Sequence, residues 1–160
     1  FTVYANRTYF SLFVVPRSTT IKTIQIVPSN TVTTGNCYLS IYSADPSTGL
    51  PKTKLWSSAS IAVGSGYTKT TASPNYTVPA GYFYLAASFS STPTIYGYQK
   101  TYSLPIFGAP DLTSGYRGYY FVADTNGFTA PASLPLSGVT FALVDYTAAN
   151  YAGVRIEFAI

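Results

Sequence analysis

Short runs of alternating side chains, separated by proline, glycine and asparagine, recur along the sequence and restrict its fold more than any other feature. In the clearest run, residues 81–89, every second side chain from Phe83 to Phe89 is apolar. Tyr82 and Tyr84 fall on the opposite face. A period of two is the pattern of a β-strand with one face in the core. Since no window combines a helical period with end caps, the sequence predicts an all-β protein.

The same punctuation divides the rest of the chain into runs of strand length. Proline cannot donate a hydrogen bond to a sheet, so the Val-Pro steps at Pro16, Pro28 and Pro79 are expected to mark strand ends. The predicted strands span residues 9–15, 21–27, 37–43, 55–63, 68–76, 81–89, 118–123, 139–146 and 154–160. About eight or nine short strands in 160 residues predict one domain, residues 1–160, with a jelly-roll-like antiparallel β-sandwich fold.

A polar turn interrupts the alternation between two of these strands. Residues 39–56 read Leu-Ser-Ile-Tyr-Ser-Ala-Asp-Pro-Ser-Thr-Gly-Leu-Pro-Lys-Thr-Lys-Leu-Trp. Asp45 can accept hydrogen bonds from amides of its own turn, and Gly49 can adopt the positive φ of a tight connection. The sequence therefore predicts a structural corner at this turn rather than a binding site.

Charged residues are scarce, at 9% of the chain against about 25% in an average soluble domain. Thr, Ser and 16 tyrosines replace them, which is typical of extracellular and virion β-proteins. The formal net charge is +4, but the nine basic residues are scattered rather than gathered in a stripe, so we expect no nucleic-acid partner. Apolar runs are only a few residues long, so we expect no membrane insertion.

The residues that usually carry catalysis or bind metals are few. The sequence has no histidine, and no two of its five acids have a spacing that predicts a glycosidase pair. The single Cys37 is expected to be a small buried hydrophobe. The stretch 124–127, Asp-Thr-Asn-Gly, resembles the start of a calcium loop but lacks the further acids, which favours an ordinary turn. We therefore expect no enzymatic activity, cofactor or metal.

Two long segments, 98–117 and 125–137, are rich in Gly, Pro and Ala and lack alternation. Loops of this length on a rigid sandwich often carry binding sites. Tyrosine rings near them suit protein interfaces or the apolar faces of sugars, although tyrosine is also an ordinary strand residue. The candidate ligand-binding residues are Tyr98, Gln99, Tyr102, Asp111, Tyr116, Arg117, Tyr119, Asp124 and Asn126.

Two motifs resemble a β-sandwich module of tail-fibre and other surface proteins of tailed bacteriophages. Residues 41–51 contain the Ile-Tyr strand end, the aspartate and the Gly-Leu-Pro turn of that module, and residues 81–86 contain its Gly-Tyr-Phe-Tyr-Leu-Ala strand. The sequence departs from the module at Lys52, where glycine is frequent, and at Tyr84, where tryptophan is frequent. The resemblance covers roughly residues 9–98 well and the C-terminal third only loosely.

This resemblance implies a piece of a larger virion protein, located at the virion surface and therefore extracellular. It implies attachment to the host cell through a surface glycan or another receptor, and it carries over no catalytic residue. Phage fibres are commonly trimers, so neighbouring virion subunits, most simply in a homotrimer, are the other expected partners. Two alternatives remain open: a structural virion protein (capsid decoration, head fibre or baseplate subunit), or a non-catalytic carbohydrate-binding module of a secreted enzyme.

Overall fold

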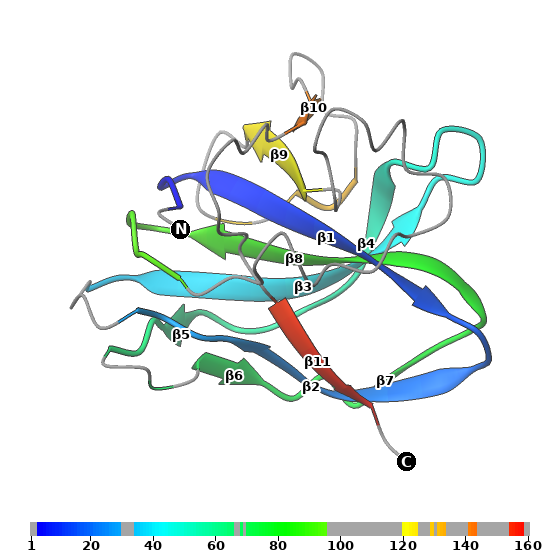
Figure 1. Ribbon diagram of the computed structural model, residues 1–160, viewed down its shortest axis with the longest axis horizontal. Helices are drawn as coiled ribbons and strands as arrows, with labels where there is room; N and C mark the ends of the chain where they lie inside the picture. Colours follow the sequence, from blue (N-terminus) through cyan, green and yellow to red (C-terminus); the bar gives the residue numbers. More distant parts are fainter. Residues whose placement is uncertain are drawn as a thin grey trace, which may run out of the picture.

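Two antiparallel sheets, packed face to face, make up the protein (Figure 1). The computed structural model describes residues 3–29, 34–65, 68, 70–95, 120–124, 129, 131–133, 141–143 and 154–158, with only the backbone in 120–124, 141–143 and 154–158. These residues form eleven strands, so the predicted all-β sandwich is confirmed. The described part of the chain holds no helix of the length and hydropathy needed to span a bilayer.

The large sheet has the order β10–β9–β1–β8–β3–β4, with β5 also paired to β3. Its central strands are β1 (Arg7–Val15), β8 (Gly81–Phe89) and β3 (Asn36–Ala44). Outside them lie β9 (Tyr120–Asp124) and β10 (Phe141–Leu143) on one side, and β4 (Pro51–Ser57) and β5 (Ile61–Ala62) on the other. In the small sheet, β2 (Thr19–Ile26) pairs with β11 (Val154–Phe158), β6 (Thr70–Ala72) and β7 (Tyr76–Val78).

Two of the predicted strands are each broken in the structure. The run 55–63 is divided between β4 and β5, where the Ser58 hydroxyl donates to the neighbouring Ala59 carbonyl at 2.7 Å, a local bond that competes with the sheet ladder. The run 68–76 is divided between β6 and β7. Pro74 has no amide to donate, and Asn75 has a φ of 45°, outside the strand region.

Two connections cross between the sheets at the same end of the sandwich. Residues 16–18 lead from β1 into β2, and residues 79–80 lead from β7 into β8. Val15 pairs with Gly81 in the large sheet, and Thr19 pairs with Val78 in the small one, so the connections run side by side. β1 and β7 end at the residue before a proline, as the Val-Pro steps predicted, and this fixes both crossings.

The core between the sheets follows the predicted alternation. Leu39 and Ile41 of β3 and Leu85 of β8 are buried against the isoleucines of β2, among them Ile24. Cys37 is fully buried in the same cluster, and this burial raises the pKa of its thiol to about 12. The residue therefore remains a neutral thiol and packs as a small hydrophobe, as expected.

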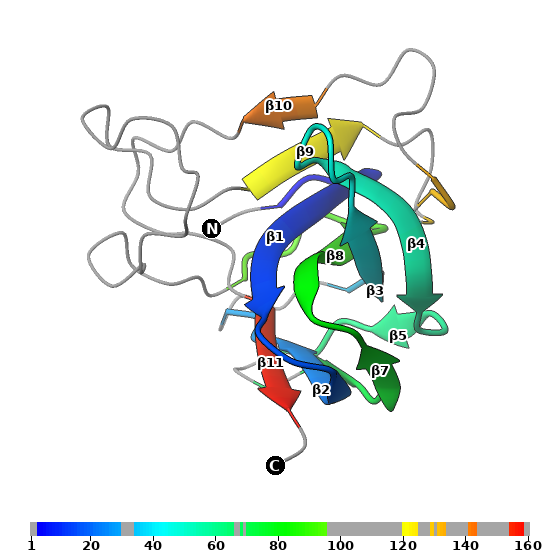
Figure 2. The same cartoon turned by 90° about the vertical axis from the view of Figure 1, so that its right-hand side faces the viewer.

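The opposite face of the large sheet is buried around Phe10, Tyr42 and Tyr84, which the alternation did not predict. Phe10 meets Tyr42 and Tyr84 edge to face, with ring centroids 5.2 and 6.3 Å apart. The Tyr42 hydroxyl donates to the Pro131 carbonyl and the Tyr84 hydroxyl to the Gly49 carbonyl, both at 2.5 Å. The large sheet curves from β9 to β4 (Figure 2). The segments that contain Gly49 and Pro131 lie against its outer face and cover this second, phenol-rich core.

Candidate functional site

Of the nine residues predicted to bind a ligand, the structure describes one, Asp124. Tyr98, Gln99, Tyr102, Asp111, Tyr116, Arg117, Tyr119 and Asn126 lie outside the described residues. Asp124 is the last residue of β9, and its backbone pairs with Arg7 at the start of β1. In the segment 125–137, Ser133 pairs with Thr53, and the Ala132 carbonyl accepts the Lys54 amide at 2.9 Å. The predicted site in these segments therefore stays a prediction.

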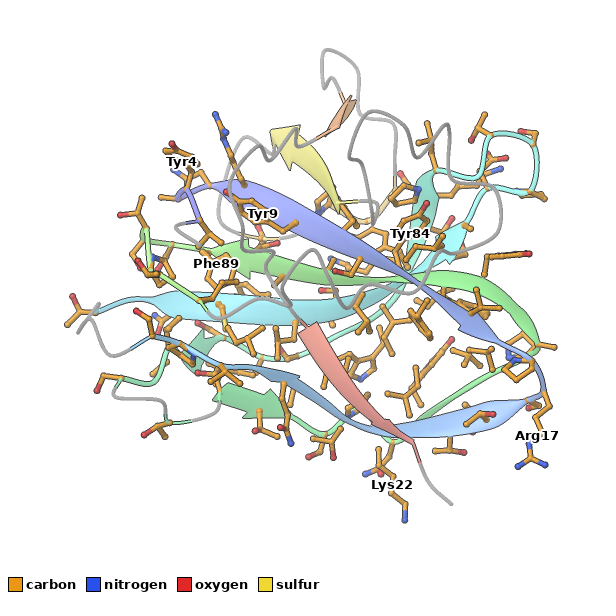
Figure 3. All side chains as sticks on the ribbon, viewed as in Figure 1. Tyr4, Tyr9, Arg17, Lys22, Tyr84 and Phe89 are labelled. Atoms are coloured by element: carbon orange, nitrogen blue, oxygen red, sulfur yellow. The ribbon has the colours of Figure 1, made fainter. Side chains whose placement is uncertain are left out.

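Three large hydrophobic side chains are exposed among those that the structure describes. They are Tyr4 at 56%, Tyr82 at 53% and Val14 at 46%. Tyr4 precedes the start of β1, whereas Val14 and Tyr82 lie at its far end. We call residues 3–7 the Tyr4 corner, and Val14, Pro16, Arg17 and Tyr82 the Tyr82 end. Figure 3 labels Tyr4 and Arg17 at opposite sides of the molecule.

The backbone of the Tyr4 corner is fixed by hydrogen bonds. The Val3 amide donates to the Pro93 carbonyl at 3.0 Å, and the Tyr4 amide donates to the Tyr9 hydroxyl at 2.6 Å. The Asn6 amide then bonds the Phe89 carbonyl at 2.8 Å. Val3 is fully buried, and Asn6 adopts a φ of 58°, so the chain turns sharply here before it enters β1.

The exposed ring of Tyr4 already has a partner within the protein. The Arg7 guanidinium lies 4.8 Å from the ring centroid, within the range of a cation–π contact. Beneath them, Tyr9 packs edge-on against Phe89, with ring centroids 6.1 Å apart (Figure 3). The side chains and backbone of the Tyr4 corner therefore have internal partners, and this corner stabilises one end of the sandwich.

The Tyr82 end is built differently, from a pair of residues directly opposite each other in the large sheet. Val14 of β1 and Tyr82 of β8 are partners in the antiparallel register. Directly opposite side chains in such a pair stand about 4.5–5.5 Å apart at Cβ. The preceding pair, Leu12 and Tyr84, lies next to the polar turn, because the Tyr84 hydroxyl bonds Gly49. Tyr82 makes no hydrogen bond or ring contact within the described part of the chain.

The connection that follows β1 contains a cation, Arg17. Arg17 is exposed, directly follows Pro16, and makes no ion pair with any acid that the structure describes. Its backbone is held in the crossing connection, since the Thr19 hydroxyl donates to the Arg17 carbonyl at 2.7 Å. Figure 3 shows the Arg17 and Lys22 side chains pointing away from the ribbon. The pair itself thus offers an aromatic ring and an aliphatic side chain to an outside partner.

The polar turn is a structural corner, as the sequence predicted. The Asp45 carboxylate accepts the Ser47 amide at 2.8 Å, the Ser47 hydroxyl at 2.6 Å and the Lys52 ammonium at 2.9 Å. Hydrogen bonds from Ser47, and then Lys52, hold the pKa of Asp45 well below its usual range. Gly49 has a φ of 71°, which glycine adopts without strain. The polar groups of this turn therefore already have partners.

Comparison with models of known protein families, with curated proteins and with solved structures gave no match. Within the described ranges, no three His, Cys, Asp or Glu side chains gather as a metal site would require. The Tyr82 end is accordingly the candidate functional site that geometry supports. Sequence reasoning missed it because it treated Tyr82 and Tyr84 alike, and the two differ only in the structure, where Tyr84 is buried and bonds Gly49 while Tyr82 is exposed.

Proposed function

We propose that this protein is an attachment domain at the surface of a bacteriophage virion, and that it binds a glycan of the host cell surface without catalysis. The resemblance of residues 41–51 and 81–86 to phage surface modules supports the location at a virion surface. The observation that carries the binding role is the exposed pair of Val14 and Tyr82 at one end of a rigid sandwich. The tyrosines predicted between residues 98 and 119 remain candidates for the same role.

The chemistry of the pair suits a sugar. A tyrosine presents a flat apolar ring to the C–H face of a pyranose and a hydroxyl to its polar edge. Both side chains stand on paired strands, and the two crossing connections fix the backbone beside them. Little conformational entropy is therefore lost on binding, which favours affinity from a small contact area.

The second candidate function is that of a structural virion protein, in which the same pair packs against a neighbouring subunit, for instance in a homotrimer. Tyrosine is enriched at protein interfaces, and this observation favours the alternative. A stable interface, however, buries about 1,000 Å² or more in total. The described surface offers three exposed large hydrophobic side chains in two separate places. A compact saccharide matches such a small site better than a subunit does.

Binding to an array of bacterial surface glycans, together with adsorption of the labelled protein to bacterial cells, tests the proposal. We expect Tyr82→Ala to weaken binding about tenfold, since the lost ring contact is worth about 1.4 kcal/mol. Tyr4→Ala is the matched control, because that ring has an internal partner, and we expect a change below about twofold. Circular dichroism checks that both variants fold.

Two results would contradict this function. Binding that is identical in the wild type and in Tyr82→Ala would remove the Tyr82 end from the site. Loss of self-association in Tyr82→Ala, measured by analytical ultracentrifugation while glycan binding is absent throughout, would favour the structural alternative. A parent reading frame with a catalytic domain would instead favour a carbohydrate-binding module of a secreted enzyme.

A further inference from the structure

The pair of Val14 and Tyr82 places an aliphatic side chain beside an aromatic ring. The two residues are directly opposite each other in the register of β1 and β8, so their Cβ atoms are about 4.5–5.5 Å apart. Both side chains are exposed, Val14 at 46% and Tyr82 at 53%. A single sugar residue that packs on the Tyr82 ring can therefore contact Val14 as well.

The described side chains next to Val14 offer little to a polar group. Leu12 precedes it on the same face of β1, and Pro16 follows the strand. On β8, the next side chain on this face is Tyr84, whose hydroxyl already bonds a backbone carbonyl. The Tyr82 hydroxyl is at the far tip of its ring. A ligand hydroxyl placed on Val14 would therefore lose water without gaining a described side-chain partner, whereas a methyl group would be stabilised by the contact.

We propose that the sugar bound at this pair is a 6-deoxyhexose, whose ring packs on Tyr82 and whose methyl group contacts Val14. This inference rests on the proposed function, and it names the class of glycan. A 6-deoxyhexose carries a methyl group where an ordinary hexose carries a hydroxymethyl group. Tyr82 supplies most of the affinity, because its ring meets either sugar. Val14 supplies the selectivity, because it distinguishes the methyl group from the hydroxymethyl group.

Pairs of methyl glycosides that differ only in the oxygen at C6 test this selectivity. Suitable pairs are those of 6-deoxy-D-glucose and D-glucose, of L-fucose and L-galactose, and of L-rhamnose and L-mannose. Their affinities are measured by NMR titration of the intact chain. In at least one pair, we expect the deoxy sugar to bind about three- to tenfold more tightly, as one buried methyl group and one hydroxyl that would lose its water predict. Its methyl protons should receive the strongest saturation transfer from the protein.

Val14→Thr is the decisive variant, because threonine has nearly the shape of valine but carries a hydroxyl in place of one methyl group. Val14 is exposed and threonine favours strands, so folding should not be impaired. We expect the preference for the deoxy sugar to fall below about twofold. Ala80→Ser is the matched control, since it adds a hydroxyl to the exposed residue before β8, outside the pair, and should leave the preference unchanged. Tyr82→Ala should weaken both sugars of a pair alike.

The outcomes separate this inference from the proposed function. Tyr82-dependent binding of array glycans, with no preference for the deoxy sugar in any pair, would overturn the deoxy class and leave the glycan-binding function standing. A preference that persists unchanged in Val14→Thr would overturn the role of Val14. A loss of preference in Ala80→Ser as large as in Val14→Thr would do the same, because any added hydroxyl would then have this effect. Failure of every glycan on the array and of every glycoside would overturn both the inference and the function.

Discussion

Tyr4 and Tyr82 are exposed to nearly the same extent at opposite ends of β1, yet their surroundings differ. The Tyr4 ring is in contact with Arg7, and its backbone is tied to Tyr9, so that the Tyr4 corner belongs to the architecture. Tyr82 stands beside Val14 on the sheet and contributes no hydrogen bond or ring contact to the described part of the protein. Exposure alone therefore does not identify a binding residue. The partners that a side chain already has are the better guide.

The largest difference in stability between the two ends is expected from substitution of Phe89, which packs beneath the Tyr4 corner. Phe89 is fully buried, packs edge-on against Tyr9, and its carbonyl holds Asn6. Phe89→Ala should lower the free energy of unfolding by about 3–5 kcal/mol. Tyr82→Ala should change it by less than about 0.5 kcal/mol, as surface substitutions do. Urea denaturation measures both values, and comparable losses would show that the Tyr82 end is structural too.

A smaller effect is expected from the hydroxyl that holds the Tyr4 corner. Tyr9→Phe leaves the ring packing in place but removes the acceptor of the Tyr4 amide. The free energy of unfolding should fall by about 1 kcal/mol, since one partly buried amide loses its partner. Tyr76→Phe is the matched control, because the half-buried Tyr76 makes no hydrogen bond among the described residues. Equal stability of Tyr9→Phe and the wild type would show that the corner does not depend on this bond.

The smallest effect concerns the polar turn next to the Tyr82 end, and it depends on pH. The pKa of Asp45 is lower in the folded protein than in the unfolded chain, where an aspartate titrates near about 3.9. Its contribution to stability is therefore present above about pH 4 and is lost as the pH falls toward the folded pKa. Asp45→Asn lacks this contribution.

Thermal melting of both proteins between neutral and acid pH measures that difference. The wild type should be the more stable at neutral pH, and the gap should close as the pH is lowered below about 4. A gap that stays constant over the whole range would show that the carboxylate charge does not stabilise the turn. Glycan binding at neutral pH should be the same in both proteins, because the turn bonds Tyr84 and not Tyr82.

Much of the fold was predictable from local pattern. The inner face of β8, with Phe83 and Leu85, and that of β3, with Leu39, were identified because apolar side chains recur at every second position. The burial of the opposite face was not predictable. Tyr42 and Tyr84 carry hydroxyls and alternate with core residues, so they look like surface positions. They are buried only because chain from distant parts of the sequence covers them.

The same distinction holds for the candidate site. The roles of Asp45 and Gly49 could be predicted, because an aspartate and a glycine at such positions act within a single turn. The Tyr82 end could not, because it arises from the register between β1 and β8, two strands far apart in the sequence. The sequence contains 16 tyrosines, and nothing local distinguishes the ring that pairs with Val14 from the others.

The contacts that cover the phenol-rich core have a consequence for how the protein can change over evolution. Among the described residues, three main-chain carbonyls attach the covering segments: those of Gly49, Pro131 and Ala132 accept from Tyr84, Tyr42 and Lys54. Every amino acid has such a carbonyl, so these bonds do not depend on which side chains the covering segments carry. Pro131 and Ala132 can therefore be replaced while the attachment to the sheet is preserved, whereas Gly49 is also needed for its positive φ. The fold thus separates an anchoring geometry that the main chain provides from side chains that are free to change.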